Sequence, residues 1–232
     1  MKKVLSLLLL SSFFVAANAQ TVDEILDKHI AAIGGKDKWL SIKSVVMDGN
    51  LTVQGTDVSV KVTQLHNKGF RQDISVAGMS GYEFYTPTEG WGFMPFQGQT
   101  KPEAKTADEV KRNFDDLDIQ GSLIDYKAKG HTIEYLGKED VEGTECFKIK
   151  VTRKNSGEQT YLIDPASYMI VRVISKTQAA GQEMEVKIDF SDYKDVAGVK
   201  IAYSISQPFG NIIFSSIKVN EPVDEALFKQ AK

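Results

Sequence analysis

The sequence has almost no cysteine. Cys146 is the only one among 232 residues, which excludes an internal disulfide and leaves burial of an apolar core as the source of stability. The alternation of its neighbours places Cys146 on the polar face of a predicted strand. No nearby residue indicates that its thiol is a nucleophile.

Recognised catalytic and metal-binding patterns are also lacking. His29, His66 and His131 are far apart in the sequence, and none of them forms an H-x-x-x-H pair. The chain has neither a G-x-S-x-G elbow nor a phosphate-binding loop. The acidic residues in the run 115–118 lack the glycine and the distal glutamate of an EF-hand loop, so we interpret them as a solvated helix face. The sequence therefore predicts no cofactor, no metal site and no catalytic residue, and a protein that is not an enzyme.

Basic residues are not concentrated in any part of the sequence. Lys and Arg number 28 against 31 Asp and Glu, and the formal net charge is −3. Proteins that bind nucleic acid usually carry a basic patch or stripe. We therefore expect no nucleic acid among the partners.

Long apolar runs are confined to the N-terminus. Two lysines precede an apolar stretch over residues 4–15, and residues 17–19 read Ala-Asn-Ala, which is typical of a secretory signal peptide. We predict that residues 1–19 are a signal peptide cleaved after Ala19 and that the protein is exported to the periplasm. No cysteine lies near the cleavage site, so no lipid anchor is expected. No later stretch approaches the roughly 18 apolar residues of a membrane-spanning helix.

Two helical segments are predicted just after the signal peptide. Thr21 and Glu24 form a capping-box pattern, and the pair Gly34-Gly35 ends the helix that follows. A second helical turn is predicted around Trp39. The apolar face of the first helix contains Val22, Ile25, Leu26, Ile30 and Ile33.

From residue 44 onward the apolar period changes from that of a helix to two. Residues 183–190 show the change most clearly, since every second side chain is apolar and the others are charged. About ten or eleven such strands at close spacing predict a mainly β fold built on one curved antiparallel sheet. We predict that residues 20–232 form a single domain.

One longer helix interrupts the predicted strands. Thr106 and Glu109 form a second capping box, and Val110, Phe114 and Leu117 follow at helical spacing in a segment that extends to residue 126. Residues 90–96, just before this helix, combine two glycines with four large apolar side chains. They are interpreted either as the rim of a cavity or as an aromatic strand end in the core. If they are a rim, the helix is a lid that closes against it.

The predicted sheet has more apolar surface than the predicted helices can cover. An apolar sheet face left open would exceed the few hundred Å² of contiguous apolar surface that is usual for a monomer. A sheet can avoid this exposure by curling into a barrel or half-barrel around the helices. The interior of such a fold is either packed solid or an apolar cavity.

Several short motifs follow one another in an order that is found in a known family. After an amphipathic helix that ends in Gly-Gly come Gly90-Trp91-Gly92-Phe93 with Pro95-Phe96, Tyr161-Leu162-Ile163-Asp164-Pro165, Asp192-Tyr193 through Gly198-Val199-Lys200, and Asn220 with Leu227-Phe228. This order resembles that of the LolA/LolB-like outer-membrane lipoprotein carrier superfamily. The resemblance covers nearly all of the chain after the signal peptide.

The resemblance implies an unclosed β-barrel with an N-terminal helix and a mid-chain lid helix on its concave side. It also implies a non-catalytic carrier that holds lipoprotein acyl chains or another lipid between the sheet and the helices. The expected partners are a lipid or acylated lipoprotein and an envelope protein that loads or receives this cargo, and the expected oligomeric state is a monomer. The residues expected to form the apolar cavity and the lid are Ile25, Leu26, Ile30, Met47, Leu51, Phe70, Trp91, Phe93, Phe96, Val110, Phe114, Leu117, Met184, Val186 and Ile188.

One feature of the sequence departs from the family. In its best-known carrier an arginine on an early strand hydrogen-bonds to the backbone of the lid and governs its opening. Residues 65–70, the corresponding neighbourhood here, contain no arginine, and Arg71 is the nearest. The release mechanism of the family therefore cannot be transferred to this chain.

Two other functions stay open on the sequence alone. One is a protein-binding or envelope-sensing module of the same fold, in which residues 91–96 are an interface instead of a cavity rim. The other is an enzyme whose acid and base residues converge from distant positions.

Overall fold

The computed structural model describes residues 21–179 and 182–230. The predicted signal peptide, residues 1–19, lies outside the described residues. No helix in the described part of the chain is long and apolar enough to cross a membrane.

One antiparallel sheet contains all thirteen strands of the described residues. The strands are β1 Ser44–Val53, β2 Thr56–Leu65, β3 Gly69–Val76, β4 Met79–Tyr85, β5 Gly90–Phe93, β6 Glu103–Ala104, β7 Thr132–Val141, β8 Thr144–Arg153, β9 Gly157–Ile163, β10 Ile170–Ala179, β11 Gln182–Val196, β12 Val199–Gln207 and β13 Gly210–Val219. Their order in the sheet is β6-β5-β4-β3-β2-β1-β13-β12-β11-β10-β9-β8-β7. Because β6 and β7 are the two edges, the barrel is unclosed, as predicted. The two strands beyond the expected ten or eleven are the short β5 and β6.

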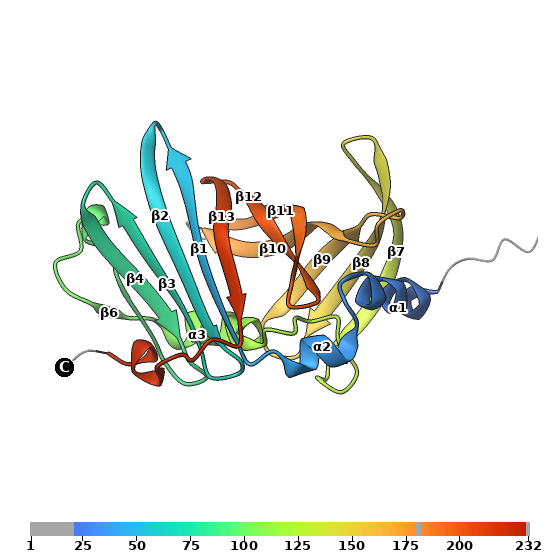
Figure 1. Ribbon diagram of the computed structural model, residues 1–232, viewed down its shortest axis with the longest axis horizontal. Coiled ribbons are helices and arrows are strands. Elements are labelled where there is room, and N and C mark those ends of the chain that lie inside the picture. Colours follow the sequence, from blue (N-terminus) through green and yellow to red (C-terminus); the bar gives the residue numbers. More distant parts are fainter. Residues whose placement is uncertain (1–20, 180–181, 231–232) are drawn as a thin grey trace, which may run out of the picture.

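Three α-helices accompany the sheet in the described residues: α1 Val22–Ala32, α2 Lys36–Ser41 and α3 Ala107–Arg112. Short 3-10 turns occur at η1 Pro95–Gln97, η2 Asp115–Leu117 and η3 Glu225–Phe228. Figure 1 shows the three α-helices gathered along one side of the curved sheet, at the bottom of the view. The predicted capping box of α1 is confirmed, since Thr21 and Glu24 each bind the backbone N–H of the other through their side chains.

The turn between α1 and α2 is pressed against the turn between β11 and β12. Gly34 has φ +113°, and a Cβ there would lie 2.3 Å from the carbonyl oxygen of Gly198. Only glycine allows such a close approach. Lys38 Nζ also donates to the Gly198 carbonyl at 3.2 Å. These contacts hold both helices at one end of β12.

The predicted lid helix is much shorter than expected. The lid segment, residues 106–126, is α-helical only at α3; the short 3-10 turn η2 follows, and the rest consists of turns. The capping box of Thr106 and Glu109 is present, but the Asn113 side chain donates to the Glu109 carbonyl and ends the helix. Gly121 and Asp125 then adopt positive φ. Left-handed residues cannot continue a right-handed helix, which explains the irregular second half.

The buried side chains form two large clusters on the concave side and a small one under α3. The first cluster joins β1, β2 and β13, and the second joins α1 to β8, β9 and β10. The small cluster contains Tyr85, Val110 and Leu117. The two large clusters belong to different halves of the sheet.

Cys146 is buried, with 1% of its surface exposed, although the alternation placed it on a polar face. Leu162 and Ile163 on the neighbouring β9 are adjacent residues, and both are 0% exposed. The sheet is therefore covered on both faces at this point, where the period-two rule of a half-exposed strand does not apply.

Candidate functional site

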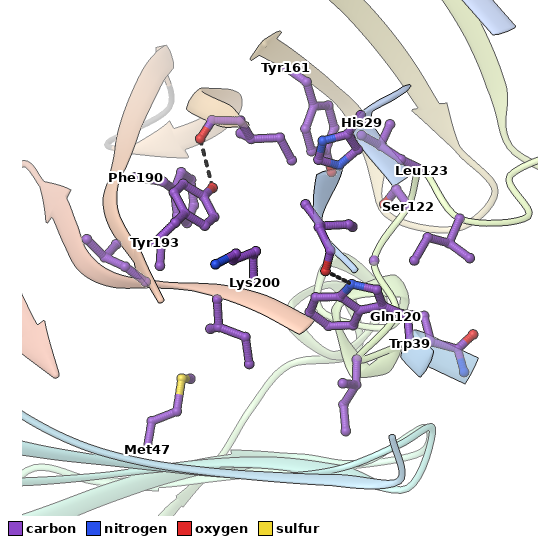
Figure 2. Close-up of a pocket in the computed structure, with 18 residues that line it drawn as sticks. His29, Trp39, Met47, Gln120, Ser122, Leu123, Tyr161, Phe190, Tyr193 and Lys200 are labelled. Carbon is purple, nitrogen blue, oxygen red and sulfur yellow. Dashed lines mark hydrogen bonds between the residues drawn. The ribbon is translucent and has the colours of Figure 1, made fainter. Parts of the chain in front are cut away.

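An apolar cavity of about 280 Å³ lies between α1, α2, the second half of the lid segment and strands β1 and β9–β12. Figure 2 shows its lining side chains around an open space. The apolar members are Ile33, Trp39, Met47, Ile119, Leu123, Ile124, Ile170, Phe190, Ile201, Ala202 and Ile205. The volume is close to the lower end of the roughly 300–1,000 Å³ that is typical of small-molecule sites.

The cavity exists because two neighbouring strands separate. β12 pairs with β13 only through Ser204–Gln207, so the first half of β12 leaves its neighbour. The backbone N–H of Lys200 donates to the carbonyl of Ile33 at 2.9 Å instead. Trp39 and Ile119 pack into the resulting wedge from α2 and the lid segment. The second half of the lid segment thus forms one wall of the cavity.

A second hollow of about 360 Å³ continues the cavity along the sheet. The two share Tyr161, Ile170, Phe190 and Tyr193, which makes them lobes of one concave surface. Ile188 and Val173 extend the apolar lining in the second lobe, which is also lined by the polar residues Asp116, Gln159 and Ser175. An elongated apolar ligand can therefore lie across both lobes.

The neutral donors on the cavity wall are already bonded to the protein. Trp39 Nε1 donates to the Ile33 carbonyl at 3.1 Å, and the Tyr193 hydroxyl donates to the Ile170 carbonyl at 2.8 Å (Figure 2, dashed lines). Burial raises the pKa of Tyr193 far above its usual value. The surroundings of Tyr193 are thus poor in water and disfavour an isolated charge.

His29 lies on the cavity wall and is 3% exposed, although the sequence placed it at the boundary of the apolar face of α1. Its Nδ1 donates to the carbonyl of Tyr168 at 2.7 Å. Burial lowers the pKa of His29, and the hydrogen bond to Tyr168 only partly offsets this effect. His29 is therefore neutral at pH 7.

Lys200 is the one lining residue that carries a formal charge. The described residues that surround the main lobe include no Asp or Glu, whereas Asp116 lines the second lobe and pairs with Arg153. Figure 2 shows the Lys200 side chain reaching into the space between the lining side chains. The cavity is thus an apolar site with a single positive group.

The first half of the lid segment is tied to the β8–β9 hairpin. The Asp115 carboxylate accepts hydrogen bonds from the backbone N–H groups of Asn155 and Ser156 and from Asn155 Nδ2, at 2.8–2.9 Å. Burial alone would raise the pKa of Asp115, but these hydrogen bonds outweigh it and lower the pKa. Asp116 forms an ion pair with the buried Arg153. The prediction of a solvated acidic face holds for Asp116, whose side chain is 52% exposed, and is wrong for Asp115 and Asp118, which are partly buried and bonded.

Two of the three histidines meet in a polar pocket of about 250 Å³ beside the lid segment. His66 Nδ1 lies 3.4 Å from Asp118 Oδ1, and Lys129 Nζ lies 2.5 Å from the other oxygen of that carboxylate. Burial lowers the pKa of both His66 and His131. In the described part of the chain, no three His, Cys, Asp or Glu side chains are arranged to hold a metal ion.

The residues predicted to form the cavity and lid are spread over several environments. Met47 lines the cavity, Ile188 lines its second lobe, and Val110 and Phe114 border a separate surface depression. Ile25, Leu26, Leu51 and Leu117 are buried in the core, Ile30, Phe70 and Val186 are partly buried, and Met184 is 53% exposed. Trp91, Phe93 and Phe96 lie on or just after β5 at one end of the sheet. Their role as ligand contacts stays a prediction.

Sequence reasoning missed most of the cavity wall. Ile119, Leu123 and Ile124 belong to the lid segment but lie off the helical stripe that marked the candidate residues. Tyr193 and Lys200 stand in the motif that supports the family resemblance, yet nothing in the motif indicates a cavity. The splayed start of β12, which brings these groups together, has no signature in the sequence.

Arg71 does not bind the lid segment in this structure. Its Nη1 donates to the carbonyl of Leu227 at 3.0 Å, its other nitrogens bind Asp73, and its guanidinium stacks on Tyr82. Arg71 therefore holds the C-terminal 3-10 turn against β3. The absence of the early-strand latch, noted in the sequence, agrees with this arrangement.

Comparison with known proteins supports the architecture. No protein-family model matches the sequence, and no curated protein matches it. A LolA superfamily protein from Nitrosomonas europaea has a similar structure, with TM-score 0.56 and 11% identity over 90% of this chain and 98% of that protein. A DUF1329 family protein from Desulfovibrio piger gives TM-score 0.55 and 14% identity over 90% and 97% of the two chains. A domain from Vibrio parahaemolyticus, provisionally assigned to outer membrane lipoprotein sorting, gives TM-score 0.52 and 14% identity over 88% of this chain and 94% of that chain. The chain has the LolA-like fold that its sequence resembles.

Proposed function

We propose that this protein is a non-catalytic periplasmic carrier that holds a lipid, or the acyl chains of a lipoprotein, in the two-lobed cavity. The apolar lining of that cavity is the observation that carries the proposal. Each methylene group moved from water into such a site contributes about 0.8 kcal/mol, so an acyl chain binds without directional contacts. The neighbours' assignment to lipoprotein sorting and to the LolA superfamily is consistent with this role.

The position of the lid segment suggests how a ligand would enter the cavity. Its second half forms a wall made of turns, while its first half is tied to the β8–β9 hairpin. Movement of residues 119–124 away from β12 would open the cavity and would require Leu123 to leave its core cluster with α1. The partners that we propose are the lipid or acylated lipoprotein itself and an envelope protein that supplies or receives it. The predicted signal peptide would bring the protein to this compartment.

Ligand capture tests the proposal directly. Protein purified gently from the periplasm of its host should release a lipid on solvent extraction, detected by mass spectrometry. The delipidated protein should take up a palmitoylated peptide and should not bind the same peptide without its acyl chain. A protein that carries no lipid and takes up neither peptide would contradict the proposal.

Two matched substitutions show whether uptake uses the cavity. Ile205 lines the cavity, whereas Ile213 on the neighbouring β13 is 49% exposed. Ile205→Trp should fill the space and reduce uptake of the palmitoylated peptide, and Ile213→Trp should leave uptake unchanged. Equal uptake by both variants would place the acyl chain elsewhere.

A further inference from the structure

The ammonium group of Lys200 has no partner within the described residues. The ion pairs and hydrogen bonds of this part of the chain give none to Lys200 Nζ. Two other lysines nearby are engaged, since Lys194 binds Asp192 and lies over Tyr203, and Lys38 donates to the Gly198 carbonyl. Lys200 therefore differs from the lysines around it.

The acid that stands opposite Lys200 in the sheet does not neutralise it. Asp195 is the register partner of Lys200 on β11. Its carboxylate accepts a hydrogen bond from the backbone N–H of Gly198 at 2.9 Å and so caps the β11–β12 turn. Asp195 is an exposed residue of this turn, whereas Lys200 lines the cavity. The positive charge thus has no negative counterpart in the wall of the main lobe, and Asp116, the carboxylate that lines the second lobe, is paired with Arg153.

An uncompensated cation in an apolar site favours a negatively charged ligand group. A lysine ammonium brings three donors and a full charge. An ion pair gains strength where water is excluded, and a charge-assisted hydrogen bond is stronger than a neutral one. Trp39, Tyr193 and Tyr161 donate to acceptors of the protein, and Lys200 is the one charged donor of the main lobe.

The size of the cavity restricts the apolar part of that ligand. The main lobe has a volume of about 280 Å³, and the second lobe continues it in one direction along the sheet. This shape suits one extended chain better than the bundled chains of a multiply acylated lipid. The charge lies in the main lobe, at the end of β12 next to the α1–α2 turn.

We infer that the cavity selects a single-chain amphiphile with an anionic headgroup, such as a long-chain carboxylate, whose headgroup binds Lys200 while its chain lies across both lobes. This inference rests on the proposed carrier function and names the ligand class for the same site. A neutral acyl ester would lose the contact to Lys200 and would leave the ammonium unpaired.

Binding of a pyrene-labelled hexadecanoic acid and of its methyl ester, followed by fluorescence, tests the inference. The two probes share a chain and differ in charge. The wild-type protein should bind the acid roughly 10- to 100-fold more tightly than the ester, as expected for one hydrogen bond to a charged group. Lys200→Met should bind both probes equally, and Lys200→Arg should retain the preference.

Lys194→Met is the matched control. Lys194 lies on β11, next to the strand of Lys200, and it is half-exposed and paired with Asp192 of its own strand. It should keep the preference of the wild type, and circular dichroism should show that all variants are folded. Equal binding of acid and ester by the wild type would overturn the anionic ligand class but leave the carrier function standing. Failure to bind either probe would overturn both. A preference that survives Lys200→Met would also overturn the role of Lys200.

Discussion

The two halves of the lid segment differ in how they are held and in what they cover. The first half contains the capped helix α3, and its Val110 and Leu117 pack with Tyr85 in a small core cluster. The second half consists of turns, and its residues from Ile119 to Ile124 line the cavity. The regular, capped half of this segment is therefore its anchor, and the irregular half is the wall that lines the cavity.

This difference has a simple physical origin. A helix buries its apolar stripe most effectively against a packed surface, which α3 finds on β3 and β4. A cavity wall must instead leave space, and turns with left-handed residues such as Gly121 allow side chains to leave a common stripe. The second half is also held by Lys129, which donates to the Gly121 carbonyl at 2.8 Å. Leu123 also packs in the core cluster with α1, and Ile124 is 1% exposed, so the two halves differ in regularity and in what they cover and not in burial.

The largest expected effect is a difference in stability between substitutions at two apolar residues that are two positions apart. Leu117 is 2% exposed in the anchor, whereas Ile119 lines the cavity. Leu117→Ala should lower the free energy of unfolding by about 2–5 kcal/mol, as for other buried leucines. Ile119→Ala should cost much less, because space already adjoins this side chain, but it should weaken retention of an acyl probe. Urea unfolding and probe binding measure the two effects.

Equal destabilisation by the two substitutions would break the comparison. It would mean that the second half is packed as solidly as the first and that the cavity is filled by side-chain movement. Weaker probe retention by both variants, measured where both are folded, would mean that the whole segment contacts the ligand.

A smaller effect is expected at the polar anchor. Asp115→Ala removes the acceptor of three hydrogen bonds from Asn155 and Ser156, and the expected loss is about 1.5–3 kcal/mol of stability at pH 7. The pKa of Asp115 is lowered in the folded protein, so the unfolded chain binds more protons as the pH falls. Stability from this carboxylate is therefore present above the unfolded pKa of about 3.9 and is lost as the pH falls through the folded pKa. Unfolding curves of both proteins at pH 7 and at pH 3 measure this.

Asp115→Asn is the control for this prediction, since it keeps an acceptor oxygen without the charge. It should be less destabilised than Asp115→Ala at pH 7. A difference between the wild type and Asp115→Ala that grows as the pH falls would contradict the sign of the pKa shift.

The sequence predicted the elements of the fold better than the site. Period-two alternation identified β1 with both of its ends, and the capping boxes marked the starts of α1 and α3 correctly, because these signals are local. The end of α3 was missed because the Asn113 side chain bonds back to the Glu109 carbonyl and Asp115 is then held by the distant β8–β9 hairpin. The cavity was mostly missed because it depends on β12 leaving β13, and strand pairing of this kind is decided by packing between distant residues. Met47 and Ile188 were found because they lie on the concave face of regular strands.

The smallest expected effect concerns Phe114, which the sequence placed on the inward stripe of the lid helix. Phe114 is 40% exposed and borders a surface depression with Pro87 and Thr88. Phe114→Asp should therefore change stability by no more than about 0.5 kcal/mol, as is usual for surface substitutions, and should leave acyl-probe binding unchanged. Thermal unfolding and probe titration of the purified variant measure both quantities.

Val110→Asp provides the matched contrast on the same helix, because Val110 is 9% exposed and packs in the cluster under α3. A carboxylate at this position would be buried without a partner, which is strongly unfavourable. Val110→Asp should therefore unfold at a clearly lower temperature than Phe114→Asp. If Phe114→Asp instead lost the acyl probe while remaining folded, the anchored half would itself move over the ligand. The boundary between anchor and wall would then lie before residue 114, and α3 would have to detach from Tyr85 whenever the cavity opens.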